Sequence, residues 1–262
     1  MDILNVIDPM EFRTYLLVLL RVSILFFMFP VFSSNVFPNT LKMGFAMVVS
    51  LLFYSVVAVD VGRFPMSAAA TGLLILAEGL VGMTMGLCLR MFFGAVQLAG
   101  QIIGFQMGFS MINVLDPQTG SNVSIMDQLG YWVCLLVFLS VNGHHIMFLA
   151  VIESFKLVPI GFFMLHDALM AKYIDLGAQI FFLALKIGAP VIASLAFVSV
   201  GFGLMAKFSP QMNVMIVAFP LKIVAGLVLF GLTLQIIAIL TKNYVTDFKG
   251  LLMQLLFFAG GG

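Results

Sequence analysis

The sequence predicts an all-α protein whose helices occupy a membrane, and its composition is the first reason. The 262 residues are 63% apolar and only 9% charged, with a mean hydropathy of +1.19. A soluble domain carries roughly 25% charged residues, because water must wet its surface. The second reason is that the apolar residues fall into runs close to the ~20 residues that a membrane helix needs. The third is that proline, glycine and asparagine gather in the breaks between runs, where they favour turns.

The apolar runs give the expected helical segments in chain order. They cover 15–31, 44–59, 68–89, 91–115, 129–152, 176–206 and 214–240. The turn-forming breaks lie at 32–42, 60–66, 115–122 and 208–213. No soluble domain, low-complexity tract or clear internal repeat interrupts this pattern, so 1–262 is predicted to form one polytopic domain. The N-terminus lacks the positive region and cleavage site of a secretory signal, so we expect the first run to be retained.

The distribution of charge says little about partners or orientation. A net charge of +1 without a Lys/Arg cluster gives no reason to expect nucleic acid or a lipid-headgroup patch. Lys42, Arg63 and Arg90 follow consecutive apolar runs, so basic residues do not alternate between successive loops as the orientation rule requires. Either some runs are not simple spans, or the helices reach their places only with partners.

Charged residues in or beside the apolar runs are predicted to be buried. They are Arg21, Glu78, Lys186, Lys207 and Lys222. A charge at the bilayer centre costs roughly 2.5–3.5 kcal/mol, so these side chains should contact protein, reach water or extend to an interface. Pairing between helices is the expected role, and a proton or ion relay is the alternative.

One face of the run 91–115 carries glycine and amide side chains. With the preceding arginine, the face consists of Arg90, Gly94, Gln97, Gln101, Gly104 and Gly108, spaced three or four positions apart on a helix. Glycines allow helices to approach closely, and glutamines can hydrogen-bond across helices. We therefore predict that this stripe faces another helix, within the chain or outside it, or an aqueous lumen.

The stripe leads into GFQMGFSMINVLDPQTGSN, residues 104–122. Phe105 and Phe109 lie four positions apart, as do Met107 and Met111, and glycines supply backbone freedom. Asp-Pro and Thr-Gly then favour a turn. Because the methionine side chain adapts to differently shaped neighbours, the segment is interpreted as an apolar hairpin tip with a polar end. Such a tip would suit a seal that closes a hole and then yields.

No active site, metal site or cofactor is predicted. His144 and His145 are adjacent and would not face each other on a helix, so packing at a helix bend is expected rather than a shared metal. Cys88 and Cys134 lie singly in apolar runs and are expected to be buried thiols, not a disulfide. Phosphate-loop, nucleophile-elbow and zinc-protease motifs are missing from the sequence. DPQTG is similar to a P-type ATPase phosphorylation motif, but the chain has no room for the domains that this chemistry needs.

Three motifs in the same order resemble the FliR family of flagellar biosynthesis proteins, which includes the SctT subunits of virulence-type secretion systems. They are residues 104–122, NGHH at 142–145 and AKFSPQMNVMIVAFPLKI at 206–223. The likeness extends over essentially the whole chain, and the VLDPQTG loop is more similar to the flagellar branch. The resemblance implies a non-enzymatic export-gate subunit of the bacterial inner membrane and flagellar basal body. In this family the assembly stands largely out of the bilayer plane.

The resemblance also implies partners, parts and sites. The partners would be FliP and FliQ, together with FlhB and FlhA, unfolded flagellar export substrates and membrane lipid. Residues 1–175 would be FliP-like, and 176–262 would be a FliQ-like hairpin that turns at Ser209, Pro210, Gln211 and Asn213. The plug loop would be 106–122, with a gate formed by Gln106, Met107, Gly108, Phe109, Ser110, Met111, Ile112, Asn113, Asp116 and Pro117.

Two other classes of function are compatible with these residues. A secondary transporter for a small solute would use the buried charges and broken helices, but such proteins usually show repeats in two halves, and none is evident. A pure assembly scaffold would nucleate the FliP and FliQ subunits without shaping the channel.

Overall fold

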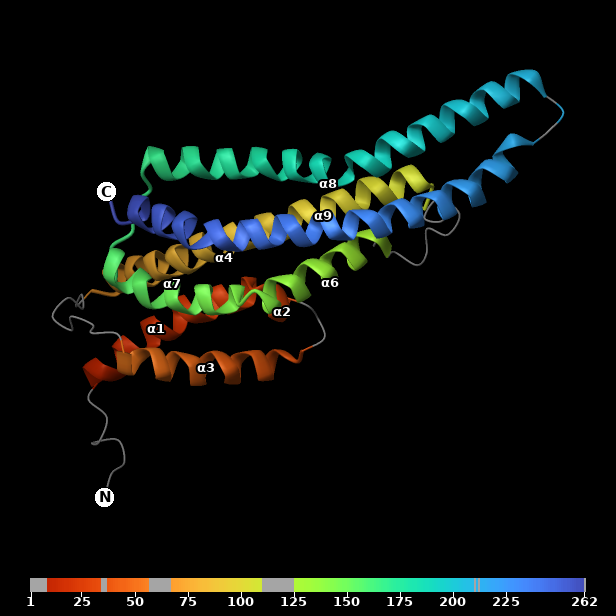
Figure 1. Ribbon diagram of the computed structural model, residues 1–262. Coiled ribbons are helices and arrows are strands. Elements are labelled where there is room, and N and C mark those ends of the chain that lie inside the picture. Colours follow the sequence, from red (N-terminus) through yellow and green to blue (C-terminus); the bar gives the residue numbers. More distant parts are fainter. Residues whose placement is uncertain are drawn as a thin grey trace. The chain divides into compact units, whose positions relative to one another are not determined.

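The computed structural model describes residues 9–33, 37–56, 67–109, 125–209, 211 and 213–261, and these residues are almost entirely helical. The helices run in the order α1 (Pro9–Met28), α2 (Pro30–Ser33), α3 (Asn39–Val56), α4 (Ala68–Met107), α6 (Ile125–Ser140), α7 (Gly143–Leu157), α8 (Asp167–Phe208) and α9 (Val214–Ala259) (Figure 1). The described part of the chain contains no strand. The prediction of an all-α fold is confirmed.

Three of these helices are long and apolar enough to cross a membrane. They are Ala68–Met107, Asp167–Phe208 and Ile216–Ala259, and a fourth span is possible if α6 and α7 count as one broken span. The axes of α6 and α7 differ by 67°. These helices support the prediction of a polytopic membrane protein.

Two of the predicted segment boundaries are wrong. The predicted break at Arg90 is absent, since α4 continues from Ala68 through Arg90 to Met107. Arg90 is exposed, and arginine is a good helix former. The run 129–152 is instead divided, since α6 ends at Ser140 and α7 begins at Gly143. Asn142 between them has φ 59° and ψ 29°, a left-handed conformation that asparagine tolerates better than most residues. An Asn-Gly pair therefore makes the bend.

The chain forms two compact units, each assembled from separate stretches. Unit 1 contains Met1–Met91, Asn142–Leu176 and Thr246–Gly262, and unit 2 contains Phe92–Val141 and Gly177–Val245. Neither unit corresponds to the predicted parts 1–175 and 176–262, because α4, α8 and α9 each contribute to both units. The assignment of those parts as FliP-like and FliQ-like stays a prediction.

In unit 1, α1 packs against α3 and α7, and the segment after α7 is bonded to the end of α9. The two helices α1 and α3 lie side by side (Figure 1), and the ring of Phe26 lies 5.4 Å from that of Phe45 and 5.9 Å from that of Phe148. The N–H of Met164 donates to the carbonyl of Ala259 at 2.9 Å. The C-terminal end of α9 is thereby fixed to the connection between α7 and α8.

Unit 2 packs α6 and parts of α4, α8 and α9 around an apolar core. The rings of Phe92 and Tyr244 stack with centroids 3.9 Å apart and planes within 8°. Phe93 makes edge contacts with Tyr131 at 5.6 Å and Phe138 at 5.7 Å. Aromatic contacts of this kind add to the free energy gained by burial, so they fix α4 against α6 and α9.

Candidate functional site

The helix α4 ends at a glycine immediately before the segment that the sequence predicts to be a seal. The N–H of Gly108 donates to the carbonyl of Phe105 and the N–H of Phe109 to the carbonyl of Gly104, both at 3.0 Å. This is the Schellman arrangement that ends helices at a left-handed residue, and Gly108 has φ +93°. A Cβ at Gly108 would also lie 2.8 Å from Cε2 of Phe219 on α9. Both the backbone and the neighbouring helix therefore require glycine here.

Met107, the last residue of α4, is fully buried. It belongs to a core cluster with Ile103, Met126, Val191, Leu195 and Phe230. On α9, Gly226 makes room for it, because a Cβ there would lie 2.5 Å from Cγ of Met107. The sequence interpretation put Met107 at an apolar hairpin tip. It packs inside the chain's own core instead, since α6, α8 and α9 all supply apolar surface around it.

The rest of the predicted gate is only partly described. Gln106, Gly108 and Phe109 are half-buried, and Phe109 packs against the core cluster. Ser110, Met111, Ile112, Asn113, Asp116 and Pro117 lie outside the described residues. Their role as a plug stays a prediction.

The predicted glycine and amide stripe of α4 lies mostly beside the packed face rather than on it. Arg90 and Gln101 are exposed, Gly94 and Gln97 are half-buried, and Gly104 is buried. No atom lies within 4 Å of the place where a Cβ on Gly94 would be. The stripe is therefore not the main contact face of α4 within the chain, although Gly104 belongs to that face.

The packed face of α4 in unit 2 is formed by large and small apolar residues that alternate. Phe92, Phe93, Val96 and Ile103 are buried together with Ala95, Ala99 and Gly100. At Gly100 a Cβ would collide with the backbone of Asp127 on α6. Backbones approach this closely only where a side chain is missing. Small residues do mark the helix contact, as the sequence suggested, but they occupy a neighbouring face.

Asp127 lies in the first turn of α6, at this close contact, and sequence analysis missed it. Its side chain is 5% exposed, and its Oδ2 accepts a hydrogen bond from Nε2 of Gln101 at 3.2 Å. Its Oδ1 is buried and has no hydrogen-bond partner among the described residues. Buried carboxylates are rarely left with a free oxygen. Its position at the start of an otherwise uncharged apolar run was the only sign in the sequence.

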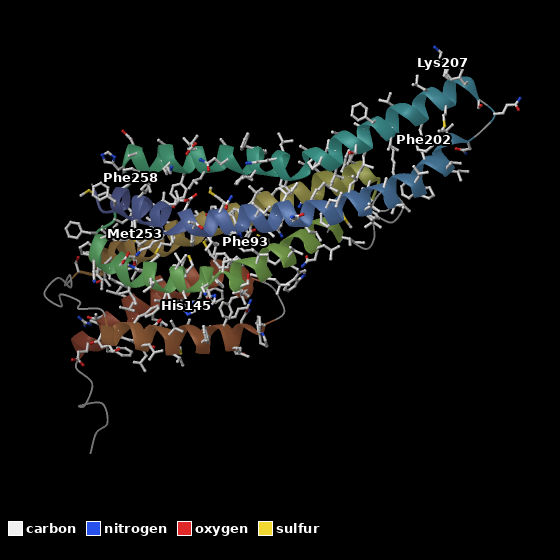
Figure 2. The ribbon with its side chains drawn as sticks, in the orientation of Figure 1. Phe93, His145, Phe202, Lys207, Met253 and Phe258 are labelled. Atoms are coloured by element: carbon white, nitrogen blue, oxygen red, sulfur yellow. The ribbon has the colours of Figure 1, made fainter. Side chains whose placement is uncertain are left out.

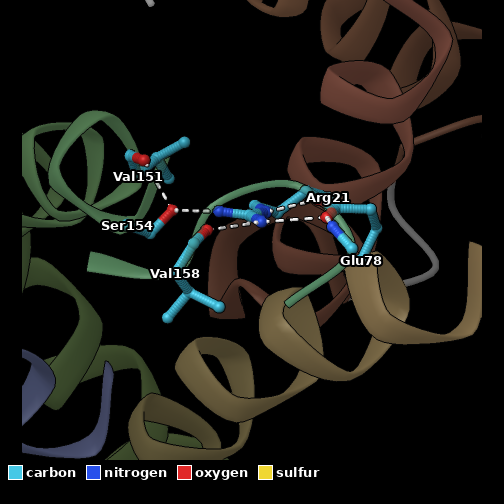
Figure 3. A network of polar contacts seen from close by, with 6 residues as sticks. Arg21, Glu78, Val151, Ser154 and Val158 are labelled. Carbon is cyan, nitrogen blue, oxygen red and sulfur yellow. Dashed lines mark hydrogen bonds and ion pairs between the residues drawn. The ribbon is translucent and has the colours of Figure 1, made fainter. Parts of the chain in front are cut away.

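A buried ion pair lies in unit 1. Nε of Arg21 donates to Oε2 of Glu78 at 2.7 Å, and NH2 donates to Oε1 at 3.0 Å (Figure 3). NH1 also donates to Oγ of Ser154 at 3.2 Å, and NH2 to the carbonyl of Val158 at 3.1 Å. The N–H of Gly161 donates to Oε1 of Glu78 at 2.9 Å. Four chain segments meet at this pair: α1, α4, α7 and the connection after α7.

The ion pair is enclosed and its charges are matched. Arg21 is 1% and Glu78 0% exposed, and the guanidinium lies 4.1 Å from the ring centroid of Phe155. The bidentate geometry is the strongest form of this interaction. Pairing between helices, the role expected from the sequence, is confirmed for these two residues.

The chain itself does not bury the three lysines, so their burial stays a prediction about the protein around them. Lys186 and Lys207 are exposed, and Lys222 is half-buried. Figure 2 shows Lys207 at the far end of α8, pointing away from the ribbon. Apolar sequence around a lysine does not decide its burial, because the exposed face of the helix is itself apolar here.

The predicted hairpin turn lies between α8 and α9. The helix α8 ends at Phe208, and α9 begins at Val214. Ser209, Gln211 and Asn213 are exposed, and the N–H of Ser209 donates to the carbonyl of Met205 at 2.9 Å. Pro210 lies outside the described residues.

His144 and His145 lie in the first turn of α7, at the bend between α6 and α7. Their ring centroids are 4.3 Å apart, and Nδ1 of His144 is buried without a hydrogen-bond partner in the described part of the chain. No group of three or more histidine, cysteine, aspartate or glutamate side chains could hold a metal ion among the residues that the structure describes. Cys88 and Cys134 are both free and buried.

Comparison with known proteins identifies the family. The family "Bacterial export proteins, family 1" matches residues 12–248. Among curated proteins, the chain is similar to the flagellar biosynthetic protein FliR of Bacillus subtilis, with 34% identity over 88% of this chain and 90% of that protein. It is 29% identical to the FliR of Escherichia coli over 91% and 90% of the two chains, and 30% identical to that of Aquifex aeolicus over 90% of each. The chain belongs to the FliR family of bacterial export proteins.

Proposed function

We propose that this member of the FliR family is a non-enzymatic subunit that lines and plugs the conduit of a flagellar export gate in the bacterial inner membrane. Its relatives are named as flagellar biosynthetic proteins, and the family is one of bacterial export proteins. The partners would be FliP and FliQ subunits, with FlhB and FlhA nearby, and the cargo would be unfolded flagellar proteins.

The observation that carries the proposal is the length of the apolar helices. At 1.5 Å per residue, the 42 residues of α8 and the 46 residues of α9 extend over about 63 and 69 Å. The hydrocarbon layer is ~30 Å thick, and a helix tilted by ~40° keeps only about 26 residues within it. Much of each helix would therefore project beyond the lipid.

Those helices expose apolar side chains near both ends. On α8, Ile174 is 71% and Phe208 83% exposed, although the two positions are about 50 Å apart along the helix. Lipid cannot cover both positions, and exposure of apolar side chains to water is unfavourable. An apolar helix longer than the bilayer needs protein around it. This requirement supports assembly with similar helical subunits and disfavours a chain that works alone in the membrane.

The open stripe of α4 would face a neighbouring subunit or the conduit. Gly94 is unobstructed and the side chains of Gln97 and Gln101 are accessible. Amide side chains in an apolar surface avoid lipid, because an unsatisfied polar group is costly there. The stripe thus has the chemistry of a wet or helix-packed surface.

Residues 106–122 would act as the plug. Met107 and the Schellman turn at Gly108 hold the start of this segment, while Ile125 begins α6 at its end. The described helices α4 and α6 therefore flank the proposed plug on its two sides. The polar residues of LDPQTGSN suit a wet lumen more than a lipid surface.

The first experiment isolates the tagged chain from native membranes in mild detergent and determines the mass of the intact complex. A defined hetero-oligomer with FliP- and FliQ-like chains is expected, and a stable monomer or homodimer would contradict the proposal. Shortening 110–122 to a glycine–serine linker should then make the reconstituted complex leakier to small ions. If the complex forms but the shortened loop leaves conductance unchanged, the chain is a scaffold and not a plug.

A further inference from the structure

Asp127 is isolated from other charges in the core of unit 2. The core of unit 2 is built from 92–107 of α4, 128–140 of α6, 187–206 of α8 and 223–241 of α9. None of these stretches contains Asp, Glu, Lys, Arg or His. Its neighbour Met126 packs with α4, α8 and α9 in the core cluster. The carboxyl group thus lies at the edge of an apolar core from which countercharges are missing.

The described groups that face Asp127 are neutral. On α4 these are Gln101, which donates to Oδ2, and Gly100, whose missing side chain allows the close approach. On α6 itself the nearest titratable groups are Tyr131 and the thiol of Cys134, one and two turns away. On α8 the flanking charges are Lys186 and Lys207, and on α9 they are Lys222 and Lys242, at the ends of the uncharged stretches. Among the residues that the structure describes, no cation forms an ion pair with the carboxyl group.

An ionised carboxylate is far more costly to bury than a neutral carboxylic acid. In the ionised form, Asp127 would carry a full charge with only two neutral donors, the side chain of Gln101 and the backbone N–H of Gln128, and with Oδ1 bare. In the protonated form the charge is gone, and the Gln101 donor serves the remaining carbonyl oxygen. The closed arrangement of α4 and α6 therefore fits the protonated acid better than the carboxylate.

The carboxyl group lies close to the exposed surface of the chain. Gln101, which contacts the carboxyl group, is exposed on the open stripe of α4. A small outward movement of the first turn of α6 would bring the carboxyl group to the same surface. The ionised carboxylate could then be hydrated, whereas the closed arrangement keeps water away from it.

We propose that Asp127 and Gln101 form a proton-operated latch between α4 and α6. In the closed state Asp127 is protonated, and the first turn of α6 packs against Gly100. When Asp127 loses its proton to water beside Gln101, the carboxylate moves toward that water. The first turn of α6 then separates from α4. Since α4 and α6 bound the proposed plug segment, the consequence for gating rests on the proposed function. The latch itself does not.

The test measures the distance between α4 and α6 as pH changes. Nitroxide labels on Phe105→Cys and Leu129→Cys use exposed positions on the two helices, while the natural cysteines are buried. Pulsed electron resonance on the full chain, within its complex where one is isolated, should show a longer distance as pH rises. Asp127→Asn should keep the short distance at every pH. The proposal would be wrong if the distance in the wild type did not change with pH, or if Asp127→Asn showed the same titration as the wild type.

Two further variants separate the latch from ordinary packing. Gln101→Leu removes a donor that favours the ionised form, so the titration midpoint should move to higher pH. Gln97→Leu, one turn away on the same stripe, should leave the midpoint unchanged. If Asp127→Asn does not fold, infrared spectroscopy of the wild type decides: the carbonyl stretch of a protonated carboxylic acid should disappear over the same pH range in which the distance lengthens. A band that is absent or does not titrate contradicts the proposal.

Failure of the latch and failure of the gate are distinguishable. The distance and infrared titrations need only the folded chain, whereas conductance needs the assembled complex. A pH-dependent distance without any change in ion leakage would retain the latch and refute gating by this segment. A plugged, loop-dependent conduit with no titration would retain the gate and refute the latch.

Discussion

The two units of the molecule treat a buried charge in opposite ways. In unit 1, Arg21 and Glu78 neutralise each other and bond to Ser154, Val158 and Gly161. In unit 2, Asp127 accepts from the side chain of Gln101 and from the backbone N–H of Gln128, and its Oδ1 has no partner among the described residues. A fully bonded network rigidifies its surroundings, and a partly bonded one is costly. Unit 1 therefore contains a fixed joint, and unit 2 contains a place that can change state.

The largest expected effect comes from breaking the joint in unit 1. Arg21→Leu leaves the buried carboxylate of Glu78 without its countercharge, which should lower the free energy of unfolding by ~3–5 kcal/mol. Scanning fluorimetry of the purified chain or complex measures the loss. The double variant Arg21→Leu, Glu78→Leu removes both charges and should recover much of it. A double variant as unstable as the single one would show that the individual hydrogen bonds matter more than charge balance.

The next effect tests whether Met107 is part of the core in unit 2. Met107→Ala should cost about 2–5 kcal/mol, because it leaves a cavity among the side chains of α6, α8 and α9. Met83 lies on the same helix and is 40% exposed, so Met83→Ala is the matched control and should change stability by no more than about 0.5 kcal/mol. Equal effects would place Met107 outside the core.

A smaller effect distinguishes the two faces of α4. Gly100→Ala introduces a Cβ against the backbone of Asp127, and overpacking of this kind should cost roughly 1–3 kcal/mol. Gly94→Ala meets no atom within 4 Å and should be stabilising by about 0.5–1 kcal/mol, since alanine favours the helix. Thermal unfolding of both variants in the same detergent gives the comparison. Opposite signs are expected, and a loss for Gly94→Ala within the complex but not in the isolated chain would identify the stripe as a subunit contact.

Sequence reasoning predicted the helical class and several breaks because both depend on local features. Apolar runs of helical length and the FSPQMN break correspond to α8, α9 and the turn between them. The Asn142–Gly143 bend was available from a turn-forming pair, but the apolar run around it concealed the division. Arg90 was read as a boundary although an exposed arginine fits within a helix.

The contacts could not be predicted in the same way. Arg21 and Glu78 are 57 positions apart, and the sequence indicates only that each charge must be satisfied somewhere. The helix α4 is apolar nearly all round, so the glycine and amide stripe was the most visible pattern but not the packed face. For Lys186 and Lys207, exposure depends on what covers α8, and this is a property of an assembly.

The smallest expected effect bears most directly on the comparison between the units. Asp127→Asn keeps the shape of the side chain and its contact with Gln101 but removes the charge, so stability should change by about 1 kcal/mol or less. Glu78→Gln is the same chemical change in unit 1, where it leaves Arg21 uncompensated and should cost several times more. Both variants are unfolded thermally at two pH values. As pH rises, ionisation of the buried, unpaired carboxyl group of Asp127 disfavours the folded form. The free energy of unfolding should therefore fall in the wild type and in Glu78→Gln, which keep Asp127. Asp127→Asn should not show this contribution. Equal losses from the two substitutions would mean that Asp127 is as tightly matched as Glu78, and the distinction between a fixed joint and a switchable one would then be wrong.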